Sequence, residues 1–183
     1  MADLDELPEL QVFEPLKSSS ETYATIHDVG GRQVGSARGT AYGRGEGIQI
    51  TDIVGRPVLD VHRRGLKTKS AIITDPAGNE LAQVVTHVGL FSGQRWELFA
   101  GGTPLARSER TRRGGLHISL LRPDGAVLAS IDGSPSVRIM FVDSPASYVL
   151  KRFHPPDRYW GMLELGAIFA IDASVRAANN SGR

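Results

Sequence analysis

The sequence contains no cysteine. The chain therefore cannot form disulfide bonds, thiolate metal sites, cysteine nucleophiles or S-palmitoylation sites. An intracellular setting fits such a composition. We expect a cytoplasmic protein that is either free or attached to the periphery of a membrane.

A targeting segment and a long apolar run are missing as well. The N-terminus, MADLDELPELQVFEPL, is acidic and has no basic region followed by an apolar one, so we expect no signal peptide. The longest apolar stretch, GMLELGAIFAIDASV, contains Glu164 and Asp172 and is shorter than the roughly 20 residues of a membrane-spanning helix. This stretch is predicted to be a buried helix.

Excess charge of either sign is also absent, since the formal net charge is +1. This near-neutrality argues against a dedicated nucleic-acid binder with a wholly basic surface, although it permits a local basic patch. Hydrophobic residues make up 40% of the chain and charged residues 22%, which is typical of a globular protein with a buried core. At 183 residues, we expect a single domain.

A repeat runs through most of the chain. Three segments share the pattern apolar-x-Asp-x-x-Gly-x-x-apolar, with the aspartates at Asp28, Asp52 and Asp75. Their spacing of about 24 and then about 23 residues indicates one supersecondary unit per repeat. Each unit is predicted to be a β-hairpin, because Asp accepts hydrogen bonds from the amides that follow it and Gly supplies a positive φ. Two degenerate copies, WELFAGGTPLA and ISLLRPDGAVLA, bring the predicted hairpins to five.

Two further β-like runs raise the predicted count to about twelve strands. They are SVRIMFV (136–142) and YVLKRF (148–153), which are joined through the turn-forming sequence DSPAS. An antiparallel sheet of that many strands rarely stays open, because its edges would template aggregation. We therefore predict an all-β fold that is closed into an antiparallel barrel.

The interior of so wide a barrel is too large for strand side chains alone to fill. After HPPD, in which Asp157 can cap a helix, the chain becomes apolar on every side of a helical wheel. We predict a buried hydrophobic C-terminal α-helix over about residues 158–175, in the centre of the barrel. Glu164 is expected to meet a polar partner inside the barrel, and Asp172 is expected to lie where the helix meets water. The bulky side chains of this core helix are Trp160, Met162, Leu163, Leu165, Ile168, Phe169 and Ile171.

The expected domain organisation follows from these elements. Residues 1–20 are predicted to be a flexible acidic segment, residues 21–178 the barrel domain, and residues 179–183 a disordered tail.

A hairpin-repeat barrel that ends in a buried apolar helix resembles the tubby C-terminal-like superfamily. The D-x-x-G hairpins at Asp28, Asp52 and Asp75, the WELF at 96–99 and the LELGAIFAID at 163–172 are most similar to phospholipid scramblases and LURP-one-related proteins. The resemblance implies a twelve-stranded barrel around a central helix, and binding of phosphoinositides or other phospholipids. The chain departs from scramblases in lacking their cysteine cluster, their Pro-rich N-terminal region and an acidic calcium-binding segment before the last helix. This departure argues against calcium-triggered scrambling.

No pattern in the sequence points to catalysis. The histidines, at positions 27, 62, 87, 117 and 154, are scattered without the spacing of metal ligands on a shared element. There is no G-x-S-x-G nucleophile motif, and the glycine-rich tract at 29–47 lacks the G-K-[ST] of a phosphate-binding loop. We expect no catalytic residue, no metal site and no cofactor, and hence a protein that is not an enzyme.

Two basic clusters are the candidate binding site. The cluster HRRGLKTK contains Arg63, Arg64, Lys67 and Lys69, and the cluster ARSERTRRGG contains Arg107, Arg110, Arg112 and Arg113. They are separated by two repeat periods, so an up-and-down barrel can bring them to the same rim. Cations grouped there attract lipid or other phosphates, at about 1 kcal/mol for each side chain near an anionic bilayer. The alternative is a pair of solvated loops that are charged for solubility.

The leading hypothesis is a non-enzymatic binding module for anionic phospholipid head groups at a membrane surface. The alternative is a protein-interaction or regulatory scaffold without lipid binding, whose N-terminal acidic segment engages a protein partner. No nucleic-acid partner is expected.

Overall fold

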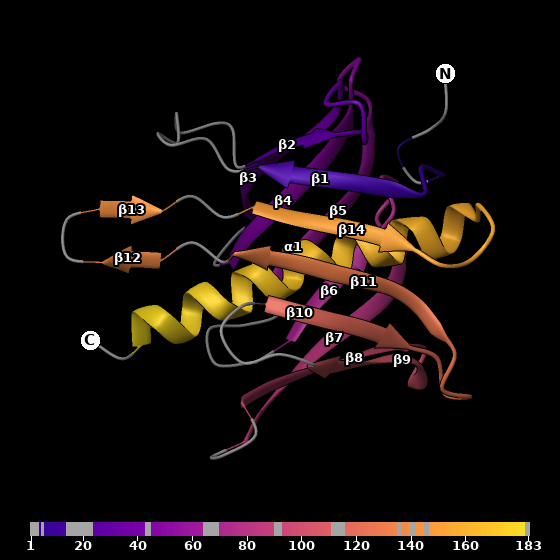
Figure 1. The fold of residues 1–183 in the computed structure, drawn as a ribbon, viewed down its shortest axis with the longest axis vertical. Coiled ribbons are helices and arrows are strands. Elements are labelled where there is room, and N and C mark those ends of the chain that lie inside the picture. The colour runs from indigo at the N-terminus through magenta and orange to yellow at the C-terminus, as the bar shows by residue number, and fades with distance from the viewer. Residues whose placement is uncertain are drawn as a thin grey trace.

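The computed structural model describes residues 4, 6–13, 24–42, 45–63, 70–89, 93–110, 116–134, 137–139, 142–144 and 147–181. Within this part of the chain, twelve strands form one closed antiparallel barrel with a single helix, as predicted (Figure 1). Around the barrel the strands follow the order β1-β14-β11-β10-β9-β8-β7-β6-β5-β4-β3-β2. Their bounds are β1 (Glu9–Phe13), β2 (Ala24–His27), β3 (Gln33–Tyr42), β4 (Gly45–Asp52), β5 (Pro57–Arg63), β6 (Ser70–Thr74), β7 (Glu80–Gly89), β8 (Gly93–Ala100), β9 (Thr103–Arg110), β10 (Leu116–Leu121), β11 (Val127–Ser134) and β14 (Ser147–Arg152).

The repeat corresponds to the hairpins β2–β3, β4–β5, β6–β7, β8–β9 and β10–β11. At the Asp52 turn, the carboxylate Oδ1 accepts hydrogen bonds from the backbone amides of Val54, at 3.0 Å, and Arg56, at 2.8 Å. Gly55 has φ 84°, a left-handed conformation that side chains other than glycine rarely adopt. Positive φ recurs at Gly31, Gly78, Gly102 and Gly125 in the other turns.

The turns also predict a pH dependence. The Asn79 side-chain amide, and then its backbone amide, hold the pKa of Asp75 below its ordinary value. A lowered pKa in the folded state stabilises the protein above the unfolded-state pKa, and this stability is lost as the pH falls through the folded-state pKa. Asp75→Asn should therefore show a shallower loss of stability below about pH 4 than the wild type, in urea unfolding followed across pH. As a control, Glu80→Gln also removes one exposed carboxylate. If the free energy of unfolding of Asp75→Asn changed with pH as steeply as that of the wild type, the turn contacts of Asp75 would not be the source of the pH dependence.

The barrel has two different ends. The five hairpin turns lie at one end, which we call the hairpin end. The connections β3–β4, β5–β6, β7–β8 and β9–β10 start and finish at the opposite end, which we call the loop end. The chain enters the helix from the hairpin end, because β14 runs toward that end and α1 (Arg158–Ser181) follows it.

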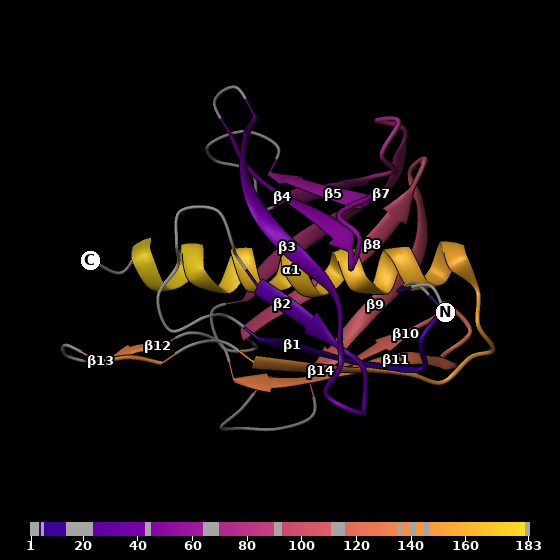
Figure 2. The ribbon, with the colours of Figure 1, turned by 90° about the horizontal axis from the view of Figure 1, so that it is seen from above.

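The helix α1 runs through the barrel, and its C-terminal end emerges at the loop end (Figure 2). The side chains of Leu163, Leu165, Ile168, Phe169 and Ile171 are at most 1% exposed, whereas Trp160 and Met162 are partly buried against the same core. The helix continues to Ser181 and so includes residues 179–181, which were expected to be part of a disordered tail. No proline or glycine interrupts the sequence between Gly166 and Gly182, so the helical hydrogen-bond ladder can continue.

The N-terminal expectation is wrong for residues 9–13, which form β1 instead of a flexible segment. This strand pairs with β14 on one side and β2 on the other, and thereby closes the barrel. Leu10 and Val12 point inward and are at most 2% exposed, so burial of this alternating pair offsets the ordering cost. Deleting residues 1–20 would therefore remove a barrel strand.

The second correction concerns residues 136–142, which were predicted to be one strand of the barrel. The structure places this run in β12 (Val137–Ile139) and β13 (Val142–Ser144), which form a separate two-stranded sheet. The count of twelve is right because β1 takes the place that this run was expected to fill.

Candidate functional site

The structure places three of the eight predicted binding residues. Arg63 ends β5, is half-buried and lies opposite Ala71 on the inward-facing register. Arg110 ends β9, so both residues lie at the loop end. Arg107 was assigned to a loop, but it lies inside β9, exposed on the outer wall opposite Glu97.

The other five predicted residues, Arg64, Lys67, Lys69, Arg112 and Arg113, lie outside the described residues. Their segments, 64–69 and 111–115, connect β5 to β6 and β9 to β10. The described strand ends that flank both segments lie at the loop end. Along the barrel wall, the strands β6 to β9 separate the two segments by roughly 15–20 Å at the usual spacing between strands.

Charge is distributed unequally between the two ends. The four short segments that join strands at the loop end, 43–44, 64–69, 90–92 and 111–115, contain only cations as charged residues: Arg44, Arg64, Lys67, Lys69, Arg112 and Arg113. At the hairpin end, the arginines of the turns are accompanied by acids, as in the ion pairs Arg32–Asp28 and Arg56–Asp52. The longer β1–β2 connection at the same end, 14–23, is mixed and contains Glu14, Lys17 and Glu21. The six cations of the four short segments favour anionic ligands by long-range attraction.

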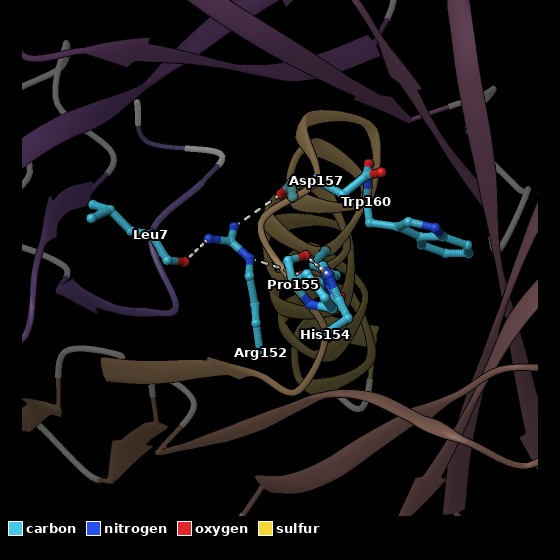
Figure 3. A network of polar contacts seen from close by, with 8 residues as sticks. Leu7, Arg152, His154, Pro155, Asp157 and Trp160 are labelled. Carbon is cyan, nitrogen blue, oxygen red and sulfur yellow. Dashed lines mark hydrogen bonds and ion pairs between the residues drawn. The ribbon is translucent and has the colours of Figure 1, made fainter. Parts of the chain in front are cut away.

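The hairpin end contains a buried polar network around Arg152 (Figure 3). The Arg152 guanidinium donates to Glu164 Oε2 at 2.9 Å, to the carbonyl of Gly161 at 3.1 Å and to the carbonyl of Leu7. The Arg152 and Glu164 side chains are only 2% and 1% exposed. The network therefore ties together β14, the start of α1 and the chain leading into β1.

His154 completes this network. Its Nε2 lies 2.7 Å from Glu164 Oε1 and its Nδ1 lies 2.7 Å from the carbonyl of Pro155. Both neighbours are oxygen acceptors, so each ring nitrogen of His154 faces an acceptor. Burial raises the pKa of Glu164, while the charges of His154 and Arg152 partly offset this rise. The expected polar partner of Glu164 thus exists, although sequence reasoning did not identify which residues supply it.

A second polar contact holds the other half of the helix. Asp172 was expected to meet water, but it is 1% exposed and accepts a hydrogen bond from the Tyr148 hydroxyl. Burial, and then the Asp172 charge, raise the pKa of Tyr148 far above its ordinary value. The correction has a geometric reason, because the helix extends further through the barrel than the sequence indicated.

The Tyr148–Asp172 and Arg152–Glu164 contacts are separated by about the same distance along β14 as along α1. Tyr148 and Arg152 are four strand residues apart, or about 13 Å. Their partners Asp172 and Glu164 are eight helical residues apart, or about 12 Å. The helix runs antiparallel to β14, so the two buried contacts together determine its depth in the barrel.

Other histidines lie on the outer wall beside carboxylates or hydroxyls. His87 contacts Glu97 at 2.9 Å, His117 contacts Asp132, and His62 contacts Thr74 Oγ1 at 3.3 Å. Among the described residues, no group of three or more His, Asp or Glu side chains is arranged to hold a metal ion.

The comparisons with known proteins supply no family. No family model matches the chain, and no curated protein matches it. Among solved structures, a porin-like protein from Bacteroides uniformis is similar with 8% sequence identity and a TM-score of 0.25, over 80% of this chain and 97% of that chain. No helix in the described part of the chain is long and apolar enough to span a membrane.

Proposed function

We propose that this protein is a non-enzymatic, scramblase-like or LURP-one-related barrel that binds anionic phospholipid head groups at a membrane surface through its loop end. The observation that supports the proposal is the placement of β5–β6 and β9–β10 at one end, where the short connecting segments contain only cations as charged residues. Each cation near an anionic bilayer contributes about 1 kcal/mol, so several at one end produce measurable binding.

The distribution of polar and apolar side chains on the barrel favours binding to a membrane surface over crossing the membrane. Its interior is apolar and filled by α1, while the outer wall contains charged side chains such as Arg95, Glu97, Arg107 and Glu109. Membrane-spanning barrels have the reverse arrangement, with an apolar band facing outward.

The test is flotation of the full chain with phosphatidylcholine vesicles that contain graded fractions of phosphatidylserine. We expect binding that increases with the anionic fraction and decreases with salt. Arg112→Glu with Arg113→Glu should weaken binding strongly. The control, Arg38→Glu with Arg95→Glu, makes the same change in net charge at exposed wall positions and should leave most of the binding intact. Binding that ignores the anionic fraction, or no binding, would overturn the proposal.

A further inference from the structure

A short segment that precedes β1 lies over the core at the hairpin end of the barrel. In the described part of the chain it consists of Leu4 and residues 6–8, and we call it the strap. Leu4 is only 3% exposed and belongs to the apolar core, and Leu7 is partly buried against the same core. Glu6 and Pro8 are exposed. The strap therefore covers the core with two leucines and turns its other side chains toward water.

Leu4 fills a space that Gly35 leaves on the inner side of the wall. Gly35 lies in β3 close to the hairpin end, on the inward register opposite Ile26. A Cβ atom at position 35 would lie 3.1 Å from Leu4 Cδ2, so the leucine packs directly on the glycine backbone. When Leu4 is absent from this position, the backbone of β3 and its apolar neighbours lose their cover.

The polar contacts of the strap pass through Arg152. The guanidinium donates to the carbonyl of Leu7, and the backbone amide of Arg152 donates to the carbonyl of Pro8 at 2.8 Å. The same guanidinium donates to Glu164 and to the carbonyl of Gly161 in α1. Figure 3 shows Arg152 between Leu7 and the start of the helix. A single buried side chain thus joins the strap to the helix.

The strap lacks the strand pairing that holds β1. Within the described residues, the pairing of β1 begins at Glu9 with β14 and at Gln11 with β2, and neither ladder includes the strap. Segments outside a ladder open at lower free energy than paired strands do. Burial of the two leucines is also opposed by the entropy that is lost when the segment is ordered. The strap can therefore separate from the core at a lower free energy than the barrel can unfold.

We propose that the strap opens and closes as a unit while the barrel stays folded, and that Arg152 is its latch. In the closed state, Leu4 covers the core over Gly35 and the Leu7 carbonyl is bound by the guanidinium. In the open state, both contacts are broken and the hairpin end of the core is exposed. Strap opening is independent of lipid binding at the loop end, because the strap lies at the opposite end of the barrel.

Thiol labelling measures the opening, since the chain contains no other cysteine. Leu4→Cys should react with a maleimide at least about tenfold more slowly than the exposed Arg95→Cys and at least about tenfold faster than the buried Ala167→Cys. Addition of Phe169→Ala, which destabilises the whole barrel, should accelerate Ala167→Cys by about 100-fold or more. It should leave the rate of Leu4→Cys within about twofold, because local opening does not require unfolding of the barrel.

Two results of this labelling would overturn the strap. If Leu4→Cys reacts as fast as Arg95→Cys, the segment is not closed over the core. If Phe169→Ala accelerates Leu4→Cys and Ala167→Cys equally, the segment opens only when the whole protein unfolds.

The latch is tested with a second substitution in the core. Arg152→Met with Glu164→Leu removes the donor to the Leu7 carbonyl and replaces the buried ion pair by apolar side chains. This double variant should accelerate labelling of Leu4→Cys by about tenfold, which Phe169→Ala does not. Circular dichroism and the melting temperature verify that the barrel is folded. An unchanged rate at position 4 would show that Arg152 does not hold the strap.

Amide hydrogen exchange of the wild-type chain tests the opening without any substitution. The Arg152 amide donates to the Pro8 carbonyl of the strap, whereas the Phe153 amide donates to the Leu128 carbonyl of β11, each at 2.8 Å. Arg152 is 7% exposed and Phe153 is 53% exposed, so solvent exposure alone predicts slower exchange at Arg152. Strap opening predicts the reverse, with exchange about tenfold or more faster at Arg152 in NMR after correction for intrinsic rates. Equal or better protection of the Arg152 amide would overturn the proposal.

Discussion

Replacing Arg152 by alanine should lower the free energy of unfolding by about 3–5 kcal/mol. The substitution leaves the Glu164 carboxylate, 1% exposed, without its guanidinium partner inside the barrel. It also removes a donor from the carbonyls of Leu7 and Gly161. Urea unfolding monitored by circular dichroism measures the loss.

The neighbouring residue provides the control. Lys151 is exposed on the outer wall, so Lys151→Ala should change stability by no more than about 0.5 kcal/mol. Replacing both charges, as in Arg152→Met with Glu164→Leu, should recover much of the loss, because well-packed apolar side chains often substitute for a buried ion pair. An Arg152→Ala protein as stable as Lys151→Ala would show that the network is not buried as described.

Replacing Phe169 by alanine should cost about 3–5 kcal/mol. Phe169 is 1% exposed in the middle of α1, and the barrel wall around it cannot collapse fully into the space that the ring leaves. The thermal midpoint should fall by many degrees, and the urea midpoint should fall with an unchanged m-value.

The matched control is Phe153→Ala, because Phe153 is 53% exposed just after β14. The substitution removes the contact between the Phe153 ring and Lys151 but leaves no cavity. We therefore expect the free energy of unfolding to change by well under 1 kcal/mol. Equal losses for the two phenylalanines would mean that α1 does not occupy the interior.

The repeat made the barrel predictable from sequence. Asp52 and Gly55 determine a turn through local hydrogen bonds and a positive φ, and both features recur with the period of a hairpin. The central helix was predictable because only a helix that is buried all round tolerates apolar residues such as Leu163 and Phe169 on every side.

The features that sequence reasoning missed depend on contacts between distant residues. Strand β1 follows no repeat, and its place is decided by pairing with β14, which is more than a hundred residues away. The short run at 137–139 has the alternation of a barrel strand, and nothing local distinguishes it from one. The burial of Asp172 depends on Tyr148 across the barrel, although an acid in an apolar helix is itself a signal that a partner exists.

For the candidate site, the spacing of two repeat periods allowed the two basic clusters to share a rim, and the described strand ends beside both clusters lie at the loop end. The sequence did not distinguish Arg107 from the other arginines of its cluster, because nothing in a run of arginines marks which of them belong to a strand. Cross-strand pairing with Glu97 decides that Arg107 belongs to the wall.

Thiol labelling distinguishes a helix α1 enclosed by the barrel from one that packs on its outside. Ala167 is fully buried on α1, so in a chain without other cysteines Ala167→Cys should react with a maleimide only as fast as the protein unfolds globally. Arg95→Cys on the outer wall should react at once. Labelling of Ala167→Cys under native conditions at the rate of Arg95→Cys would contradict the enclosed helix and the fold described above.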